Sequence, residues 1–150
     1  MARRHKNETL LLSKEEAEPM RGWILFDAKG KTLGRFASEV AKILRGKHKT
    51  TFTPHIDSGD GVVIVNAKEV VVTGNKEAQK EYHRYTGHIG GGRKTSYRMM
   101  QERRPTEIIR LAVKGMMPKT KLARAQLKRL RIFAEDKHTM QAQKPLEVNA

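Results

Sequence analysis

The sequence predicts an α/β domain in which helices pack against a sheet of buried strands. Two observations support this fold class. Short apolar runs at residues 23–27 and 61–67 alternate with segments of helical periodicity, which is the order typical of layered α/β folds. The second run, GVVIVNA, is rich in β-branched residues and apolar at successive positions, as in strands of a parallel sheet that is covered on both faces.

The first third of the chain predicts a strand followed by a helix. The apolar stretch WILFD, Trp23–Asp27, runs into the turn sequence AKGK. Thr32 suits a helix cap, apolar residues from Leu33 to Leu44 recur at helical spacing, and Gly46 stands where a helix stop is expected. We therefore expect a strand, a tight turn and a helix that ends at Gly46.

The middle of the chain predicts two strands and then a surface excursion. The turn DSGD leads into a strand at Gly61–Ala67, and the stretch VVVTG, Val70–Gly74, predicts another. From Asn75 to Tyr97 the sequence is polar, aromatic and Gly-rich, with three successive glycines at its centre. We interpret this segment as a long excursion that carries a ribbon or a short helix.

The last third predicts two helices and a final strand. Pro105 fits the first turn of a helix, and Ile108 and Val113 belong to its apolar stripe. After the break GMMP, a second helix is expected from about Lys119 to Leu130, and RIFAE follows as a short strand. The predicted organisation is a polar N-terminal extension over residues 1–21, one α/β domain over residues 22–136 and an irregular tail over residues 137–150.

The composition points to an anionic partner. The 150 residues carry a formal net charge of +15, from 31 Lys and Arg against 16 Asp and Glu. A folded protein with this charge repels itself unless nucleic acid or an anionic membrane compensates it. No apolar run approaches the ~20 residues that cross a bilayer, and there is no cysteine for disulfides, thiol nucleophiles or zinc. We expect a soluble protein that is not secreted.

The sequence AKGKTLGR raises the alternative of a nucleotide-hydrolysing enzyme. Gly30, Lys31 and Thr32 match the end of the phosphate-loop motif G-x-x-x-x-G-K-[ST], but the first glycine of that motif falls at Leu25, inside the predicted strand. We favour a tight strand-to-helix turn, where Lys31 and Arg35 help to hold a phosphate of a larger molecule at the helix N-terminus.

A second basic pattern lies near the C-terminus. Seven cations and no carboxylate occur between Lys114 and Arg131, whereas a solvated helix face usually mixes Glu with Lys. Four of these cations step by three, four and three residues, which places them on one helical face, while apolar residues occupy another. The pattern predicts a polyanion-binding face, and a solubilising face is the alternative. The seven are Lys114, Lys119, Lys121, Arg124, Lys128, Arg129 and Arg131.

Two further segments combine cations with other features of RNA recognition. RGKHKTTFTPH follows the first predicted helix, and HRYTGHIGGGRK mixes cations with tyrosine and glycine. Glycines allow close backbone approach, and aromatic rings stack on splayed bases; a flexible hairpin tip is the alternative for the second segment. Distributed cations on loops favour a folded RNA over DNA or a membrane.

Nothing in the sequence predicts catalysis. The six histidines form neither an H-x-x-x-H nor an H-E-x-x-H pair, and turn chemistry accounts for Asp57 and Asp60 in DSGD. We expect no metal site, no cofactor and no enzymatic activity.

Several stretches in the same order resemble the bacterial large-subunit ribosomal protein L13 family over about Trp23 to Pro145. They are DAKGKTLGRFASEVAKILRGKHK, FTPHIDSGDGVVIVNA, VTGNK, YHRYTGHIGG and AVKGMMPKTKLARAQLKRLRIFA. The resemblance implies a three-layer α/β/α domain with a mainly parallel sheet of about four strands, basic loops and extended termini. It implies binding to large-subunit 23S ribosomal RNA early in assembly, beside neighbouring large-subunit proteins. It further implies a cytoplasmic location in the ribosome, no membrane partner and no small-molecule substrate.

The resemblance implies that the family's basic positions correspond here to Lys31, Arg35, Arg45 through Lys49, Arg84, Lys114, Lys119, Lys121, Arg124 and Lys128. Together with the charge pattern they predict an RNA-binding set of Lys31, Arg35, Arg45, Lys47, His48, Lys49, Arg84, Arg93, Lys94, Lys114, Lys119, Lys121, Arg124, Lys128, Arg129 and Arg131. The sequence departs from the family before Trp23, at Ala123, where glycine is common, and in the tail. A free-standing RNA or DNA chaperone of the same charge is the remaining alternative.

Overall fold

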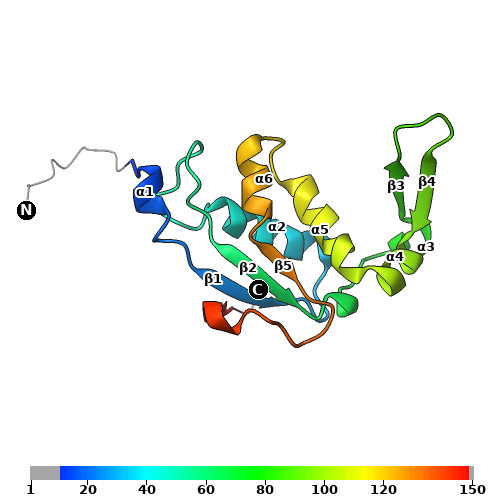
Figure 1. Ribbon diagram of the computed structural model, residues 1–150. Coiled ribbons are helices and arrows are strands. Elements are labelled where there is room, and N and C mark those ends of the chain that lie inside the picture. Colours follow the sequence, from blue (N-terminus) through cyan, green and yellow to red (C-terminus); the bar gives the residue numbers. More distant parts are fainter. Residues whose placement is uncertain (1–10, 149–150) are drawn as a thin grey trace, which may run out of the picture.

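A computed structural model describes residues 11–148, so residues 1–10 of the predicted extension and the last two residues of the tail lie outside the described part. Its centre is a four-stranded parallel sheet flanked by helices (Figure 1), which confirms the three-layer α/β fold. The strands, in their order across the sheet, are β5 (Leu130–Ile132), β2 (Gly61–Val65), β1 (Trp23–Asp27) and β6 (Leu146–Glu147).

The pairing of β1 with β2 forms the middle of the sheet. The two strands run parallel, with Trp23 opposite Gly61 and Asp27 opposite Val65. Every residue of β2 is buried, as predicted from its unbroken apolar sequence. On one side of the sheet, Phe26 meets Phe36 edge-to-face, with ring centroids 6.1 Å apart.

Helix α2 (Leu33–Arg45) connects β1 to β2 and has the predicted bounds. Its apolar stripe is buried from Leu33 to Leu44. Gly46 closes the helix in the left-handed conformation, with φ 85°, and its N–H donates to the carbonyl of Ile43. Thr32 occupies the N-cap position, but its side chain forms no capping hydrogen bond.

The predicted strand at Val70–Gly74 is wrong. After the short helix η1 (Ala67–Glu69), Val71 makes a single parallel bridge with Thr32, and this segment does not join the four-stranded sheet. The fourth strand is β6, for which the sequence gives no signal. It pairs with β1 through Ile24 and Leu25, after a segment that carries η2 (Gln141–Gln143).

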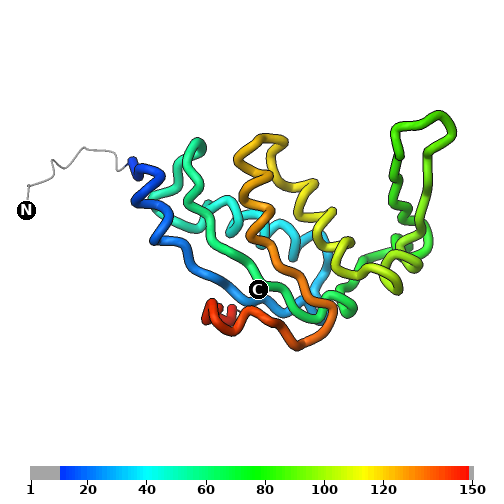
Figure 2. Tube along the Cα trace, viewed as in Figure 1, coloured from blue at the N-terminus to red at the C-terminus, as the bar shows by residue number. Residues whose placement is uncertain are grey.

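Residues 75–97 leave the body of the domain as a ribbon, as predicted. After α3 (Lys76–Gln79), the antiparallel strands β3 (Glu81–Tyr85) and β4 (Gly92–Ser96) form an arm that projects from the body (Figures 1 and 2). Helix α4 (Tyr97–Arg103), which was not anticipated, begins after Ser96, whose hydroxyl accepts from the N–H of Met99.

Two more helices complete the layer that contains α2. Helix α5 (Pro105–Met116) has proline in its first turn and packs on α2, and α6 (Lys121–Leu127) also contacts α2. The predicted extension of α6 to Leu130 is wrong. The N–H of Lys128 donates to Ala125 and that of Arg129 to Gln126, which tightens the last turn. The Arg129 carbonyl then accepts from Val62 at the entrance to β5.

The N-terminal residues that the structure describes are tied to the domain. Helix α1 (Lys14–Ala17) starts with a capping box between Ser13 and Glu16. Ala17 is buried, and the carbonyl of Met20 accepts from the Lys49 ammonium at 2.9 Å. These contacts join residues 13–20 to the loop that follows α2.

Candidate nucleic-acid interface

Helix α6 presents the cations that the sequence singled out. Lys121, Arg124 and Lys128 lie on its outer side, whereas Ala123 and Gln126 are buried against the body. The helix is therefore anchored on one side and cationic on the other, as the three-and-four spacing predicts. Because α6 stops at Leu127, Arg131 lies on β5 and does not extend the helical row.

The ends of α2 and α5 form a second group. Arg45 and Lys47 line a pocket of about 360 Å³ together with Met116 and Met117. The Arg45 guanidinium lies 5.7 Å from the centroid of the Phe52 ring. Met116 is 46% exposed, so apolar and cationic groups face the same hollow. This combination suits a nucleotide, whose base stacks on apolar surface while its phosphate meets a cation. A pattern of charges gives no signal for Met116, because its side chain is apolar.

The beginning of α2 contributes Lys31 and Arg35. Both line a pocket of about 370 Å³ that Phe36 also borders. The N–H groups of Gly30 and Lys31 are already bonded, to the carbonyls of Glu69 and Ala28. The turn therefore lacks the row of open N–H groups with which a phosphate loop holds a nucleotide.

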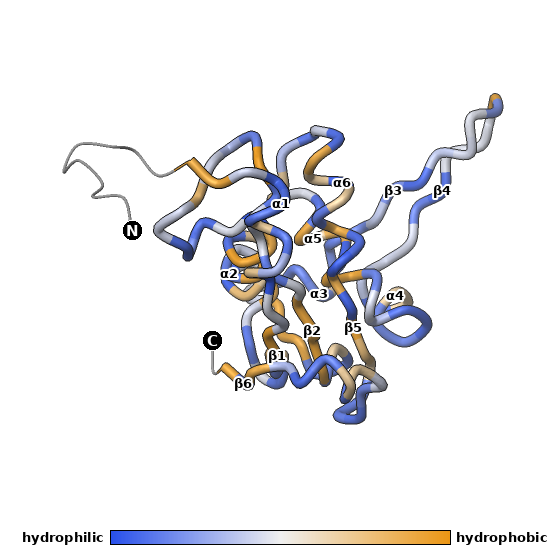
Figure 3. The backbone as a smooth tube through the Cα atoms, turned by 60° about the vertical axis from the view of Figure 1, so that its left-hand side comes forward, coloured by the Kyte–Doolittle hydropathy of each residue, from blue (hydrophilic) through white to orange (hydrophobic). Residues whose placement is uncertain are grey.

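The arm carries further predicted cations, and one of its cross-strand pairs is unfavourable in isolation. Arg84 stands directly opposite Arg93. Like charges at directly opposed positions destabilise an antiparallel ribbon. The next pair differs, because Lys94 Nζ, opposite His83, lies 3.5 Å from the Glu81 carboxylate. Figure 3 shows a largely hydrophilic arm with an apolar tip, and Tyr85 is 67% exposed. An anionic partner would relieve the repulsion between Arg84 and Arg93.

Three basic residues of the predicted set, Lys49, Arg129 and His48, are engaged inside the fold. The Asp60 carboxylate, which is buried, accepts from Lys49 Nζ at 2.5 Å and lies 2.7 Å from His48 Nε2. The Arg129 guanidinium donates to both oxygens of Asp57, at 2.5 and 2.6 Å. These ion pairs fasten the loop between α2 and β2 to the body. Sequence reasoning assigned both aspartates to turn chemistry and missed this role, because Asp57 and Arg129 are 72 positions apart.

The ionisation of Asp57 depends on its partners. Burial by itself would raise the pKa of this carboxyl, but the hydrogen bonds and charge of Arg129, with the charge of Arg21, hold the pKa below its usual value. A depressed carboxyl pKa contributes stability above the pKa of the unfolded chain and loses it as pH falls through the native value.

We therefore expect acid to weaken the fold partly through this pair. The free energy of unfolding should fall as pH drops from about 5 to about 2. In Asp57→Asn, the free energy should be lower at neutral pH and should change less over that interval. Urea unfolding at a series of pH values measures both quantities, and parallel pH profiles for the two proteins would contradict the assignment.

Three predicted cations belong to none of these groups. Helix α2 packs against α5 and contacts α6, so the cations of these three helices share one layer of the domain (Figure 1). The arm stands apart from them. Lys114 on α5, Lys119 in the loop before α6 and Arg131 on β5 are exposed.

In residues 11–148, no three His, Cys, Asp or Glu side chains gather as metal ligands. No helix there is long and apolar enough to cross a membrane.

Comparisons with known proteins point to one family. The family model described as Ribosomal protein L13 matches residues 21–139. A Dictyoglomus thermophilum protein named large ribosomal subunit protein uL13 is 54% identical over 142 residues, which are 95% of this chain and 99% of that protein. Proteins of the same name from Clostridioides difficile and Rubrobacter xylanophilus are 53% and 56% identical, over 89% and 87% of this chain and 93% of each relative.

Proposed function

The chain belongs to the ribosomal protein L13 family, and on that premise we propose that it is a structural constituent of the large ribosomal subunit. In this role it binds 23S ribosomal RNA early in subunit assembly, beside other large-subunit proteins, and it catalyses no reaction. The similar proteins named above are large-subunit proteins by name.

One observation carries the RNA-binding part of the proposal. Exposed cations occupy α6 and its flanks, and this part of the sequence contains no carboxylate. The carboxylates Asp57 and Asp60 form ion pairs inside the fold. The opposed pair Arg84 and Arg93 adds a charge repulsion that an anion offsets. A polyanion with phosphates spread over a surface meets these requirements.

The arrangement suggests how the protein joins RNA segments. The cations of α2, α5 and α6 lie on the body, and those of β3 and β4 lie on an arm that extends away from it (Figure 1). Two phosphate-binding surfaces separated in this way hold two RNA segments at a fixed relative position. Phosphate contacts fix position, whereas the pocket with Met116 offers a place for one unstacked base.

A nucleotide-hydrolysing enzyme is a poorer fit. Its phosphate loop would have to begin inside β1, and the N–H groups of Gly30, Lys31 and Leu33 all donate to carbonyls of the domain. The turn requires a glycine at position 30, because the φ of Gly30 is 67°, in the left-handed region.

The proposal is tested by measuring affinity for a 23S ribosomal RNA fragment and for an unrelated structured RNA over a salt series. If about six phosphates are neutralised, log K should fall with log salt with a slope of roughly −4 to −6. A steep slope with a clear preference for the ribosomal fragment supports a specific site. A steep slope without preference supports the free-standing chaperone instead, and saturable micromolar ATP binding would revive the enzyme.

The substitution Arg84→Glu should change the stability of the arm and its RNA affinity in opposite directions. Glutamate opposite Arg93 replaces a repulsive pair by an attractive one, so the ribbon should gain about 0.2–1 kcal/mol. RNA affinity should nevertheless fall, with a salt slope smaller by about one. Lys137→Glu is the matched control, because it makes the same charge change at an exposed lysine outside the predicted set. Equal losses of affinity in both variants would show that only net charge matters.

A further inference from the structure

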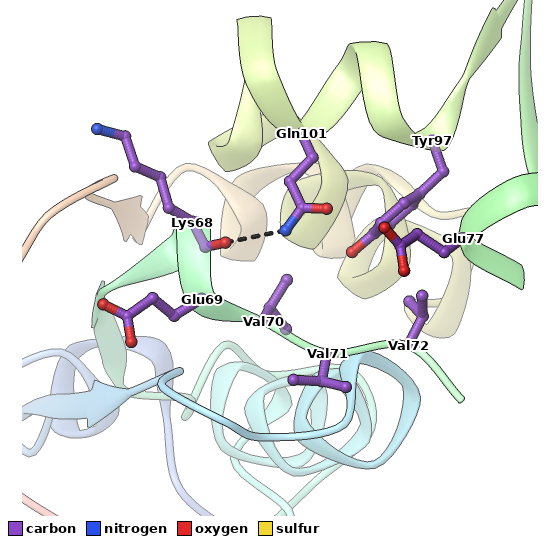
Figure 4. Close-up of a pocket in the computed structure, with 8 residues that line it drawn as sticks. All are labelled: Lys68, Glu69, Val70, Val71, Val72, Glu77, Tyr97 and Gln101. Carbon is purple, nitrogen blue, oxygen red and sulfur yellow. Dashed lines mark hydrogen bonds between the residues drawn. The ribbon is translucent and has the colours of Figure 1, made fainter. Parts of the chain in front are cut away.

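A pocket at the base of the arm differs in character from the cationic surfaces. It has a volume of about 230 Å³ and lies between the segment Val70–Val72 and the first turns of α4 (Figure 4). Two carboxylates, Glu69 and Glu77, border it, in a chain whose net charge is +15. The complete lining is Lys68, Glu69, Val70, Val71, Val72, Glu77, Tyr97 and Gln101.

One wall of the pocket is a strand edge without a partner. The N–H of Val71 donates to Lys31, and its C=O accepts from Leu33. Because successive backbone groups of an extended chain point in opposite directions, the N–H and C=O groups of Val70 and Val72 point away from Lys31 and Leu33. None of the hydrogen bonds formed among residues 11–148 uses these groups. Such an edge accepts an added strand.

The α4 side of the pocket holds a buried hydroxyl that has no partner among the described residues. Tyr97 is only 1% exposed, and its hydroxyl makes no hydrogen bond within the described residues. Figure 4 shows the hydroxyl pointing into the pocket. Burial, and then the charge of Glu77, raises the pKa of Tyr97, so the hydroxyl remains a proton donor. A buried donor that makes no hydrogen bond costs free energy. A ligand whose carbonyl accepts from this hydroxyl would remove that cost and so bind more tightly.

The two carboxylates are held loosely. Glu69 lies 3.6 Å from the Lys29 ammonium and Glu77 lies 3.6 Å from Arg98 Nε, and all four side chains are more than half exposed. Exposed pairs of this length contribute little, so an incoming cation exchanges for either partner. In Figure 4 the two carboxylates lie near opposite ends of the Val70–Val72 segment.

We propose that this pocket binds an extended, basic segment of a second protein, which adds as a short strand to Val70–Val72. Lysine or arginine side chains of the segment then lie beside Glu69 and Glu77, and one of its carbonyl groups accepts from the Tyr97 hydroxyl. RNA does not fit this site, because the carboxylates repel phosphate. The proposal does not depend on the RNA interface, since it uses none of the residues predicted to bind RNA.

The test uses the whole chain and a defined peptide, acetyl-Thr-Lys-Val-Lys-Thr-Lys-Val-amide. The peptide is cationic, so its binding to a protein of charge +15 cannot reflect general attraction. We expect a dissociation constant on the order of 100 µM, from a few hydrogen bonds and two exposed ion pairs. In NMR spectra, the amides of Val70 and Val72 should shift. A peptide with N-methylated backbone amides should not bind, and one with glutamate for lysine should bind more weakly.

Two variants test whether the peptide binds in this way. Tyr97→Phe removes a hydroxyl that has no partner within the described residues, so the free protein should keep or gain stability, while peptide affinity falls about three- to tenfold. Glu69→Gln combined with Glu77→Gln should lower peptide affinity about five- to tenfold. Both variants should retain the RNA affinity of the unsubstituted protein, and Lys121→Ala, as the matched control, should retain peptide affinity.

Opposite results would overturn the proposal. They are amide shifts confined to the arm or α6, equal affinity for the N-methylated peptide, or a Tyr97→Phe protein that binds the peptide normally. Displacement of the peptide by a ribosomal RNA fragment that shifts the same Val70 and Val72 amides would assign the pocket to RNA instead. If the RNA salt series showed no specific RNA binding, peptide binding would still support the proposal for this pocket.

Discussion

Replacing Lys121, Arg124 and Lys128 together by alanine is expected to lower affinity for a 23S ribosomal RNA fragment roughly a hundredfold at about 0.1 M salt, from about 1 kcal/mol for each lost phosphate contact. The slope of log K against log salt should become shallower by about two to three, because three fewer counterions are released. These side chains lie on the outer side of α6, and the buried side of the helix holds Ala123 and Gln126.

The fold should survive this triple substitution. Alanine is the best helix former, and none of the three side chains takes part in the ion pairs that fasten the domain. Circular dichroism and thermal unfolding provide the check. The matched control replaces cations outside the predicted set, Lys14, Lys76 and Lys137, by alanine. Equal loss of affinity in this control, or unfolding of the α6 variant, would show that the binding face is wrongly assigned.

Gly59→Ala is expected to destabilise the domain by about 3 kcal/mol, since overfilling a packed interior costs about 1–3 kcal/mol and occasionally more. A Cβ atom at this position would stand 1.8 Å from the carbonyl oxygen of Leu44 and 2.6 Å from its carbon. Both are backbone atoms at the end of α2, so a side-chain movement cannot relieve the overlap. The loop that carries Asp57 and Asp60 would have to move away from the helix.

Chemical denaturation measures this loss, and the expected fall in melting temperature is about 10 °C. Gly115→Ala is the matched control. A Cβ atom there meets nothing within 4 Å, and the residue lies inside α5, so alanine should add about 0.5–1 kcal/mol of stability. Equal stability of the two variants would contradict the close approach between Gly59 and Leu44.

The elements that were predictable from sequence are those whose pattern is local. Helix α2 shows an apolar stripe between a cap and a glycine stop, and β2 is an unbroken β-branched run. The failures depend on distant partners. The stretch after Val70 has the composition of a strand, yet only Val71 finds a hydrogen-bonding neighbour among the described residues. Strand β6 has two residues and exists because β1 leaves an open edge.

In the candidate site, too, local patterns were predictable from the sequence and contacts between distant residues were not. The cationic face of α6 follows from spacing alone, and the structure places Lys121, Arg124 and Lys128 on the outer side. The engagement of Arg129 with Asp57 was hidden, because a charge count does not reveal which cation has an acidic partner inside the fold. The pocket beneath Tyr97 was equally hidden, since it depends on the unbonded edge of a segment that looked like a complete strand.

The pairing of the first strand with the last has a consequence for synthesis. Strand β1 lies in the interior of the sheet and pairs with β2 on one side and with β6, at residues 146–147, on the other. While a nascent chain is being made, β1 and β2 emerge and pair first, and the outer edge of β1 stays uncovered until the residues of β6 have left the exit tunnel. An uncovered edge recruits strands from other chains. Shortened chains that stop before Leu146 are therefore the ones most exposed to aggregation.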